Sequence, residues 1–247
     1  MQLYHHPYSL DSQKVRLALE EYNIDYTSYH VNPLTGKNME SSFFRMNPSA
    51  RLPVFQNGSH IIFNTIEIIQ EVDEWMHKIQ DWNPKIFTLS HIPERYRLFV
   101  SKFIRRVVIA RMAESPNLAS IYHLKLRDAY ETEDKLKDPD VLKQNEECLI
   151  RLLDEVEMQL SNSAYLAGEH FTMADATLIP VLARIMLLNL EHEYIFIRPK
   201  VAEYWKTMKQ RPSYRKVIGR YFTGWRKYKI LSKTIFFLCI RSVLKKY

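Results

Sequence analysis

The chain has 247 residues, of which 46% are hydrophobic and 26% are charged, and its formal net charge at pH 7 is +7. This length accommodates one large domain or two small ones. Its two cysteines, Cys148 and Cys239, exclude a disulfide framework or a cysteine metal set. No signal peptide precedes Gln2, so we expect a reduced, cytoplasmic setting.

The first eighty residues alternate between strand and helix patterns. The predicted elements are strands at 2–5 and 26–31, a helix at 12–21, a hairpin at 54–63 that turns at Asn57-Gly58, and a helix that Asn64 or Thr65 caps and that runs through Val72. This order predicts a small α/β unit in which a parallel crossover is followed by an antiparallel hairpin.

Pro53 lies where a predicted strand begins, directly before Val54. Proline cannot donate to a strand ladder, so it belongs at the start of a strand or at a sheet edge. A proline in this position is a candidate for a cis peptide bond, which is typical of a tight, specific turn. The backbone of Leu52 would then be free to meet a peptide-like ligand, so we interpret this turn as a binding site.

The rest of the chain is rich in helical patterns. Apolar stripes predict helices at 95–114, 141–160, 174–190 and 201–209. The third is nearly apolar throughout, which is typical of a core helix, and Pro180 should kink it or mark a broken first turn. Residues 80–93, with prolines near both ends, are predicted to be a linker. Residues 128–140 are densely charged and are predicted to be a solvated extension between helices.

The positive charge is concentrated in the C-terminal tail. Arg211–Tyr247 contains eleven of the 35 Lys and Arg residues and no Asp or Glu. The uncharged run Ile235–Ile240 has six residues, whereas a membrane span needs about twenty, so we exclude a transmembrane helix. Basic and aromatic residues together fit a surface helix at an anionic bilayer, with Cys239 as a candidate for palmitoylation. The alternative is that the tail packs over the helices; no nucleic-acid motif is present.

Two motifs resemble those of the soluble glutathione transferases. Asn47-Pro48 followed by Leu52-Pro53-Val54 resembles the family's strand-3 turn, where the second proline is cis. Residues 164–175 resemble the start of the family's sixth helix, where Thr172 would cap the helix and Asp175 would reach back to it. Residues 9–26 look most like the tetrachlorohydroquinone-dehalogenase-like class, known in plants, and next most like the zeta class.

This resemblance implies an α/β thioredoxin-like N-terminal domain followed by an all-α C-terminal domain. The implied boundaries are 1–79 for the glutathione-binding domain, 80–93 for the linker, 94–212 for the helical domain with its charged insertion near 128–140, and 213–247 for the basic amphipathic tail. A homodimer is also usual in this family, although no dimer patch is evident in the sequence.

A glutathione transferase has to favour the thiolate of glutathione, because the thiolate is the nucleophile. A hydroxyl donor at a helix N-terminus is well suited to this task, since the helix dipole favours an anion. Ser9 precedes the first helix and lies five residues before Lys14, the spacing of the active serine or cysteine and a basic residue in related classes. Ser12 is the second candidate, with a helix N-cap as its simpler role, and Tyr8 is the third.

The resemblance also implies a glutathione-binding set. The Leu52 backbone and Pro53 would pair with the cysteinyl part, and Asn64 with Thr65 would hold the γ-glutamyl group. Arg51 would meet the glycine carboxylate as a charged partner, and Lys37 is a second candidate for it. The simpler alternatives are that Asn64 and Thr65 cap a helix and that Arg51 is a solvated turn residue. No metal is implied.

Asp11 departs from the pattern of the bacterial dehalogenases, which have a cysteine at this position. A carboxylate cannot form the mixed disulfide with glutathione that reductive dehalogenation requires. That activity is therefore doubtful, whereas conjugation or peroxide reduction by bound glutathione needs no protein thiol.

We therefore expect a glutathione transferase that conjugates or reduces small hydrophobic electrophiles in the cytoplasm, or peripherally at the plasma membrane through residues 213–247. The helix that lines the electrophile site in this family carries Arg105, Arg106, Val108, Ile109 and Met112. Two alternatives stay open. One is a non-catalytic adaptor, because the charged insertion and the basic tail are similar to those of ganglioside-induced differentiation-associated proteins. The other is a carrier of apolar ligands.

Overall fold

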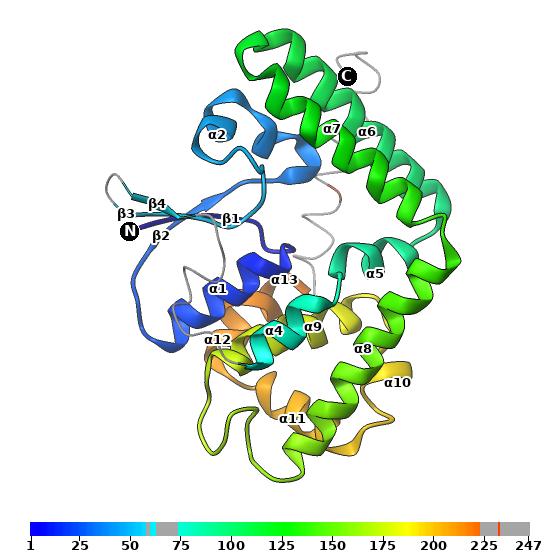
Figure 1. Ribbon diagram of the computed structural model, residues 1–247. Coiled ribbons are helices and arrows are strands. Elements are labelled where there is room, and N and C mark those ends of the chain that lie inside the picture. The colour runs from blue at the N-terminus through cyan, green and yellow to red at the C-terminus, as the bar shows by residue number, and fades with distance from the viewer. Residues whose placement is uncertain (58–59, 63–73, 223–231, 233–247) are drawn as a thin grey trace.

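The computed structural model describes all residues except 58–59, 63–73, 223–231 and 233–247 (Figure 1). The first part of the chain builds a small sheet with short helices around it. Its elements are β1 (Gln2–His5), α1 (Leu10–Glu21), β2 (Thr27–His30), the 3-10 turns η1 (Pro33–Thr35) and η2 (Lys37–Met39), α2 (Ser41–Met46), β3 (Val54–Asn57) and β4 (His60–Ile62).

The sheet has the strand order β2-β1-β3-β4. β1 pairs with β2 in parallel, with Leu3 opposite Ser28, and with β3 in antiparallel, with Leu3 opposite Phe55. β3 and β4 form the antiparallel hairpin. The predicted parallel crossover and hairpin are therefore confirmed. The predicted helix that starts at Asn64 or Thr65 lies outside the described residues, as does Gly58 of the predicted turn.

Helix α1 begins earlier than predicted, because its N-cap is Ser9 and not Ser12. Ser9 has an extended backbone, and its side chain accepts a hydrogen bond from the amide of Ser12. An N-cap hydroxyl satisfies an amide of the first helical turn that has no partner within the helix. Starting at Leu10 also buries this side chain in the main hydrophobic core, together with Leu17.

The second part of the chain is helical. Its elements are α4 (Glu74–Asp81), α5 (Pro84–Ser90), α6 (Glu94–Glu114), η3 (Pro116–Leu118), α7 (Ala119–Lys135), α8 (Pro139–Leu160), α9 (Met173–Leu187), α10 (Glu191–Tyr194) and α11 (Pro199–Met208). Figure 1 shows α6 and α7 side by side as a long helical hairpin that reaches past α2. The four helices predicted in this part are confirmed, with ends shifted by a few residues.

The two connecting segments are more helical than their sequences suggest. Residues 80–93 contain helix α5, whose N-cap Asn83 accepts hydrogen bonds from the amides of Lys85 and Ile86. Most of the charged stretch 128–140 is helical, because it forms the end of α7 and the start of α8. This stretch has no apolar stripe from which its helices could be predicted. Exposed ion pairs such as Arg127–Glu131 support the helical surface instead.

Helix α9 is the centre of the main core, and almost all of its residues are buried. The helix continues through Pro180. The predicted contact between Thr172 and Asp175 is confirmed, because Oδ2 of Asp175 accepts from the Thr172 amide at 2.8 Å. Its other carboxylate oxygen accepts from the Leu166 amide at 3.2 Å and from the Tyr204 hydroxyl at 2.8 Å. Asp175 therefore joins the preceding loop and α11 to the start of α9.

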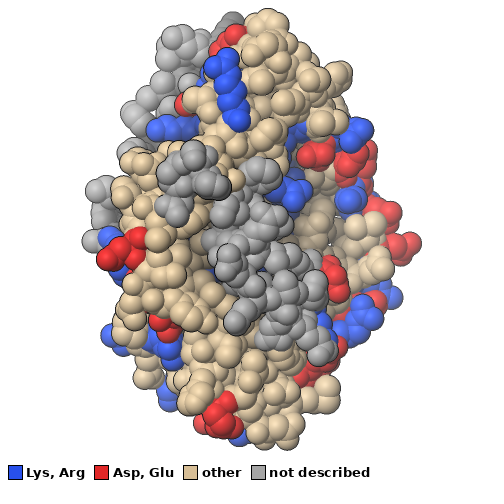
Figure 2. All heavy atoms as spheres, turned by 60° about the vertical axis from the view of Figure 1, so that its left-hand side comes forward, with Lys and Arg blue, Asp and Glu red and all other residues tan. Residues whose placement is uncertain are grey.

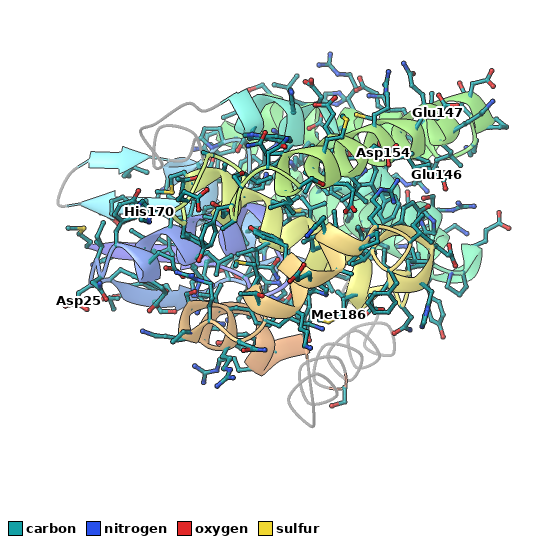
Figure 3. All side chains as sticks on the ribbon, turned by 90° about the horizontal axis from the view of Figure 1, so that it is seen from below. Asp25, Glu146, Glu147, Asp154, His170 and Met186 are labelled. Carbon is teal, nitrogen blue, oxygen red and sulfur yellow. The ribbon has the colours of Figure 1, made fainter. Side chains whose placement is uncertain are left out.

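Acidic residues along α8 hold the following helices (Figure 3). Glu146 accepts a hydrogen bond from the hydroxyl of Tyr194 in α10. Asp154 forms an ion pair with the largely buried Arg198, the N-cap of α11. These contacts explain why α8 carries charge on a face that packs against neighbouring helices.

A short segment after α11, which we call the C-terminal strap, returns to the first part of the chain. It consists of α12 (Pro212–Tyr214), the π-helical turn η4 (Arg215–Gly219) and α13 (Arg220–Phe222). The strap buries four apolar side chains in the main core, namely Tyr214, Val217, Ile218 and Phe222. The start of the predicted tail therefore packs on the body, while the rest of it, except Ser232, lies outside the described residues.

Charges of both signs are mixed on the surface of the described residues. On the face drawn in Figure 2, acidic and basic side chains alternate along one edge. None of the described helices is both long enough and apolar enough to cross a membrane.

Candidate functional site

The candidate site is built around Ser9, at the junction of the β1–α1 loop and helix α1. The Ser9 hydroxyl donates to the carbonyl oxygen of Leu52 at 3.3 Å and accepts from the Ser12 amide at 3.3 Å. The Ser9 amide donates to the carbonyl of His6 at 3.0 Å, which closes the loop. The fold thus brings together two predicted site residues, Ser9 and Leu52, that are 43 positions apart.

The second wall of the site is the loop before β3. The Leu52–Pro53 peptide bond is cis, which confirms the sequence prediction, and both residues are buried. Asn47 shapes this loop, because its side chain donates to the Arg51 carbonyl at 2.9 Å and accepts from the Ser49 hydroxyl at 2.7 Å. Asn47 was not predicted as a site residue, although Asn-Pro-Ser is a recognised turn signal.

The other two candidate hydroxyls are engaged elsewhere. Ser12 is fully buried, and its oxygen lies 3.4 Å from the amide of His6, which donates to it. The Tyr8 hydroxyl donates to the carbonyl of Tyr221 at 2.9 Å, and its ring stacks on Phe222 with centroids 5.2 Å apart. Among these three, Ser9 is the hydroxyl that faces the cis-proline loop.

Arg184 reaches the site from α9, and sequence reasoning missed it. Its guanidinium donates to the carbonyl of Tyr8 and, at 3.5 Å, to the hydroxyl of Thr88. Burial lowers the pKa of Arg184 to about 10, although the nearby Asp11 carboxylate acts in the opposite direction. The available signal was the one basic residue in a mostly apolar helix, since a buried charge requires partners.

An anion beside Ser9 would lie near groups that favour negative charge and near one group that opposes it. The amides at the N-terminus of α1 and the Arg184 guanidinium favour negative charge there. Asp11 opposes it, but Asp11 also lies 3.5 Å from the Nζ atom of Lys14. Burial lowers the pKa of Lys14, and its pair with Asp11 counteracts that effect. We infer that the helix terminus and Arg184 are the groups that support an anion.

Behind the loop lies a group of uncharged histidines. Burial lowers the pKa of His6 to about 4, and the nearby His30 ring and the Arg184 guanidinium act in the same direction. Burial, Arg16 and neighbouring histidines likewise lower the pKa of His5 to about 2. The Nε2 atom of His5 lies 2.6 Å from the Ser28 hydroxyl. At neutral pH these rings act as polar packing groups and add no positive charge to the site.

The remaining predicted glutathione-binding residues are only partly described. Lys37 and Arg51 are both exposed. Their segments are joined, because the Asn38 side chain donates to the Ala50 carbonyl at 2.8 Å. Asn64 and Thr65 lie outside the described residues.

The residues predicted to line the electrophile site take different positions on α6. Val108 is fully buried in a small core with Phe44 and Tyr122, so it packs between helices. Arg105 forms an ion pair with Glu133 of α7 at 3.1 Å. Arg106 and Ile109 are exposed, and Met112 packs at the edge of the small core.

The described residues contain no group of three or more His, Cys, Asp or Glu side chains that could hold a metal ion. Cys148 is half-buried beside the main core.

Comparisons with known families match both parts of the chain. Residues 8–75 match the family described as glutathione S-transferase, N-terminal domain, and residues 139–212 match glutathione S-transferase, C-terminal domain. The glutathione S-transferase TCHQD of Arabidopsis thaliana is 63% identical over the full length of both chains. The tetrachloro-p-hydroquinone reductive dehalogenase of Sphingobium chlorophenolicum is 28% identical, over 91% of this chain and 97% of that protein.

Solved structures agree at the level of the fold. Gtt2 from Saccharomyces cerevisiae superimposes with a TM-score of 0.60 at 17% identity, covering 88% of this chain and all of that one. Glutathione transferase F7 from Populus trichocarpa superimposes with a TM-score of 0.56 at 20% identity, covering 87% of this chain and 96% of that one. Both support the thioredoxin-like domain followed by a helical domain.

Proposed function

The chain belongs to the glutathione S-transferase family, and on that premise we propose that its Ser9 hydroxyl activates the thiol of glutathione, its cosubstrate, for attack on small hydrophobic electrophiles. The observation that carries this proposal is the position of Ser9. Its hydroxyl lies at the N-terminus of α1 and 3.3 Å from the carbonyl of Leu52, in the turn with the cis proline.

In the proposed mechanism, Ser9 donates its hydroxyl proton in a hydrogen bond to the glutathione sulfur in place of the Leu52 carbonyl. A hydrogen bond to the charged form lowers a pKa, and the dipole of the 12-residue helix α1 acts in the same direction. Arg184 fixes the preceding peptide by holding the Tyr8 carbonyl. In conjugation the thiol proton passes to solvent, the thiolate sulfur bonds to the electrophilic carbon, and the leaving group departs from that carbon with its electron pair. Ser9 thus stabilises the nucleophile without itself forming a covalent bond.

Glutathione would lie along the loop before β3. We propose that the Leu52 backbone and Pro53 pair with its cysteinyl part, while Asn64 and Thr65 hold the γ-glutamyl group. Arg51 is the first choice for the glycine carboxylate and Lys37 the second. The exposure of both cations and the link between their segments support these assignments.

The reaction is proposed to be conjugation or glutathione-dependent peroxide reduction. Asp11 occupies the first turn of α1 and has no thiol to offer, so reductive dehalogenation by a mixed disulfide remains doubtful for this chain.

We also propose that the enzyme is a cytoplasmic homodimer that binds anionic membrane surfaces, such as the plasma membrane, through its tail. The sequence after Phe222 contains seven Lys and Arg residues and no Asp or Glu, together with aromatic residues, which favours an anionic surface. Co-sedimentation with anionic and with neutral vesicles tests the membrane contact, and the mass in solution tests the dimer.

Steady-state conjugation of glutathione to chlorodinitrobenzene tests the proposed chemistry. Loss of a preorganised donor that stabilises a developing or reacting anion typically costs about 100-fold or more in kcat, so we expect Ser9→Ala to lose about that much. Ser161→Ala, at the exposed end of α8, serves as the control and should keep full activity. Equal kcat values for the Ser9→Ala variant and the wild type would refute the role of Ser9.

A further inference from the structure

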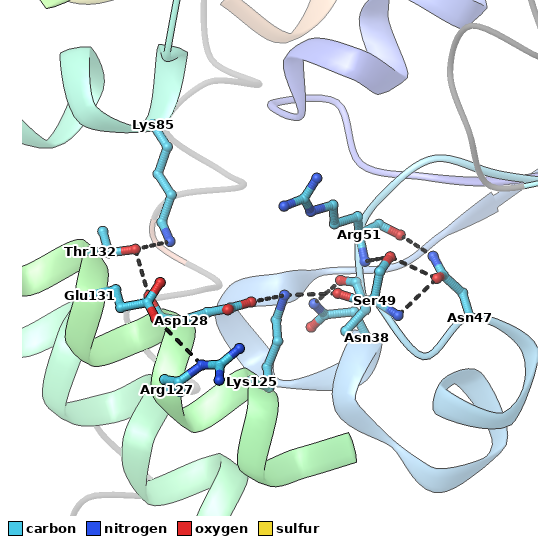
Figure 4. A network of polar contacts seen from close by, with 11 residues as sticks. Asn38, Asn47, Ser49, Arg51, Lys85, Lys125, Arg127, Asp128, Glu131 and Thr132 are labelled. Atoms are coloured by element: carbon cyan, nitrogen blue, oxygen red, sulfur yellow. Dashed lines mark hydrogen bonds and ion pairs between the residues drawn. The ribbon is translucent and has the colours of Figure 1, made fainter. Parts of the chain in front are cut away.

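Three cations meet where the loop before β3 faces the helical part of the chain, and we call them the cationic cluster: Arg51, Lys85 and Lys125. They come from three separate segments, because Arg51 belongs to the cis-proline loop, Lys85 to the first turn of α5 and Lys125 to the middle of α7. Figure 4 shows the Arg51 side chain extending from the loop toward the two lysines.

Lys125 has a structural contact that accounts for its position. Its Nζ atom donates to the Ser49 carbonyl at 2.7 Å and lies 4.0 Å from the Asp128 carboxylate. Lys125 therefore joins α7 to the cis-proline loop. This contact does not explain why Arg51 and Lys85 point toward the same region.

Lys85 is held by a neutral group. Its Nζ atom donates to the Thr132 hydroxyl at 2.8 Å, and that hydroxyl donates in turn to the Asp128 carbonyl at 2.8 Å. Among the described residues, the Arg51 guanidinium makes no hydrogen bond or ion pair, and only its backbone is bonded to Ser49 and Asn47. Two of the three cations therefore have donors available for a further acceptor.

The negative charge nearby does not balance the cluster. Asp128 is the carboxylate that acts on both lysines, and the neighbouring Glu131 pairs with Arg127 at 3.4 Å. Burial lowers the pKa of Lys125 to about 8, Asp128 opposes this, and Arg51 and Lys85 lower it further. Desolvation also lowers the pKa of Lys85, and Arg51 and Lys135 add to that effect. The cations repel one another, and a bound anion would relieve that repulsion.

We propose that Lys85 and Lys125, beside Arg51 at the glutathione site, bind an acidic group of the second substrate, so that the enzyme prefers electrophiles bearing a carboxylate or a similar anion. This inference rests on the proposed transferase function and extends it to the class of substrate.

The helical origin of the two lysines separates this role from binding of glutathione. Arg51 lies on the cis-proline loop, where the glycine carboxylate of glutathione is expected, and one guanidinium can hold one carboxylate in a bidentate manner. Lys85 and Lys125 belong to the helices, the part of the fold that is expected to present the electrophile. If the lysines hold the carboxylate of the electrophile, removing a lysine should impair turnover of acidic electrophiles. If they hold the glycine carboxylate of glutathione, removing a lysine should raise the KM for glutathione.

The test uses a matched pair of electrophiles, a chloronitrobenzoate and its methyl ester, which differ in charge at one position. For the wild type we expect a higher kcat/KM with the acid than with the ester, and this preference should shrink as salt screens the charges. In the variant Lys85→Met, which leaves the contact between Lys125 and the Ser49 carbonyl in place, kcat/KM for the acid should fall about tenfold or more, the factor that corresponds to about 1.4 kcal/mol. The values for the ester and the KM for glutathione should stay within about twofold.

Two further variants control for structural damage. Lys85→Arg keeps the positive charge and should retain most of the preference for the acid. Lys143→Met removes an exposed lysine of α8 that pairs with Glu147, and it should change neither substrate.

Several results would overturn the inference: no preference for the acid in the wild type, equal losses with acid and ester, or a raised KM for glutathione in the methionine variant. The last result would assign the lysines to the glycine carboxylate. If the wild type conjugates neither compound, the proposed transferase function is refuted, and a binding measurement is needed to test the role of the lysines. Calorimetric binding of the chloronitrobenzoate to the wild type and to Lys85→Met then decides, and equal affinities would refute the cluster's role.

Discussion

Ser9 performs two tasks with one side chain, because it caps α1 and faces the cis-proline turn. Both contacts of its hydroxyl are 3.3 Å long. A hydroxyl usually donates at about 2.8 Å, so the bond from Ser9 to the Leu52 carbonyl is long and weak. Ser9 therefore loses little when it donates to a thiolate instead. At the helix N-terminus, Ser9 can therefore donate to an anion with little loss of stability in the loop.

The neutral histidines behind Ser9 make stability depend on pH. The pKa of His6 is lowered to about 4, whereas an unfolded histidine titrates near its ordinary value of about 6.5. Below that value the unfolded state binds a proton that the folded state rejects, so stability falls with pH. We expect His6 to account for up to about 2 kcal/mol of lost unfolding free energy between pH 7 and pH 5.

Denaturant unfolding of wild type and His6→Asn at both pH values measures this contribution. The variant should lose less stability on acidification than the wild type, while His170→Asn, at an exposed position labelled in Figure 3, should behave as the wild type. Identical pH dependence in all three proteins would show that His6 is not held neutral.

The C-terminal strap packs against helix α1 and the β1–α1 loop. The Arg211 guanidinium, just before it, donates to both carboxylate oxygens of Glu21 at 3.0 and 2.6 Å, and Ser213 donates to the same carboxylate. Farther along, Arg16 donates to the Val217 carbonyl at 3.2 Å. The strap thus follows α1 from its C-terminus to Tyr8 near its N-terminus.

Removing Arg211 should loosen this strap. Burial raises the pKa of Glu21, but the hydrogen bonds from Arg211 and Ser213 outweigh it and leave the pKa below its ordinary value. A carboxylate with a depressed pKa stabilises the fold above its unfolded pKa, and that stability is lost as pH falls through the folded value. Arg211→Met should therefore cost about 1–3 kcal/mol at pH 7.

Unfolding measurements on Arg211→Met and on Arg215→Met, an exposed arginine of the strap, separate the ion pair from general charge. The difference between Arg211→Met and the wild type should shrink as the pH falls below the ordinary glutamate pKa of about 4.3, because the unfolded chain then takes up a proton before the folded wild type does. A cost shared equally by both variants would argue against a specific role for the Glu21–Arg211 pair.

At the scale of the whole molecule, the predicted tail consists of two parts that we expect to have different functions. Residues 213–222 bury apolar side chains against the core, whereas the sequence after Phe222 contributes seven basic residues. A chain ending at Phe222 should therefore fold and bind glutathione like the full chain but lose binding to anionic vesicles. A chain ending at Pro212 should lose stability and glutathione affinity together.

Calorimetric glutathione titration, thermal unfolding and vesicle co-sedimentation of the two truncated chains measure these outcomes. Loss of glutathione affinity in the chain that ends at Phe222 would contradict this division. Vesicle binding that survives the same truncation would refute the membrane role of the tail.

Much of the fold was predictable from the sequence because its signals are local. Alternation, apolar stripes and the Leu52-Pro53 turn predicted the sheet, the longer helices and the cis bond. The predicted start of α1 was wrong, because Ser9 and Ser12 are both suitable N-cap residues. The packing of Leu10 in the core favours Ser9.

The parts of the site that were missed depend on long-range contacts. Arg184 meets the Tyr8 carbonyl across 176 positions, and Lys125 meets the Ser49 carbonyl across 76. No local pattern encodes such pairs, since each side chain looks like an ordinary member of its helix. A buried basic residue in an apolar helix was the one signal available, and it gives no information about its partner.

The central claim is that the Ser9 hydroxyl stabilises the glutathione thiolate, and the ultraviolet absorbance of that thiolate across pH tests it most directly. A hydrogen bond to a charged group is worth about 1.5–3 kcal/mol, which corresponds to about one to two pKa units. We expect the thiol of glutathione bound to the wild type to titrate below its free pKa, and Ser9→Ala to move that pKa back toward the free value by this amount. Bound glutathione with the same thiol pKa in both proteins would contradict the claim.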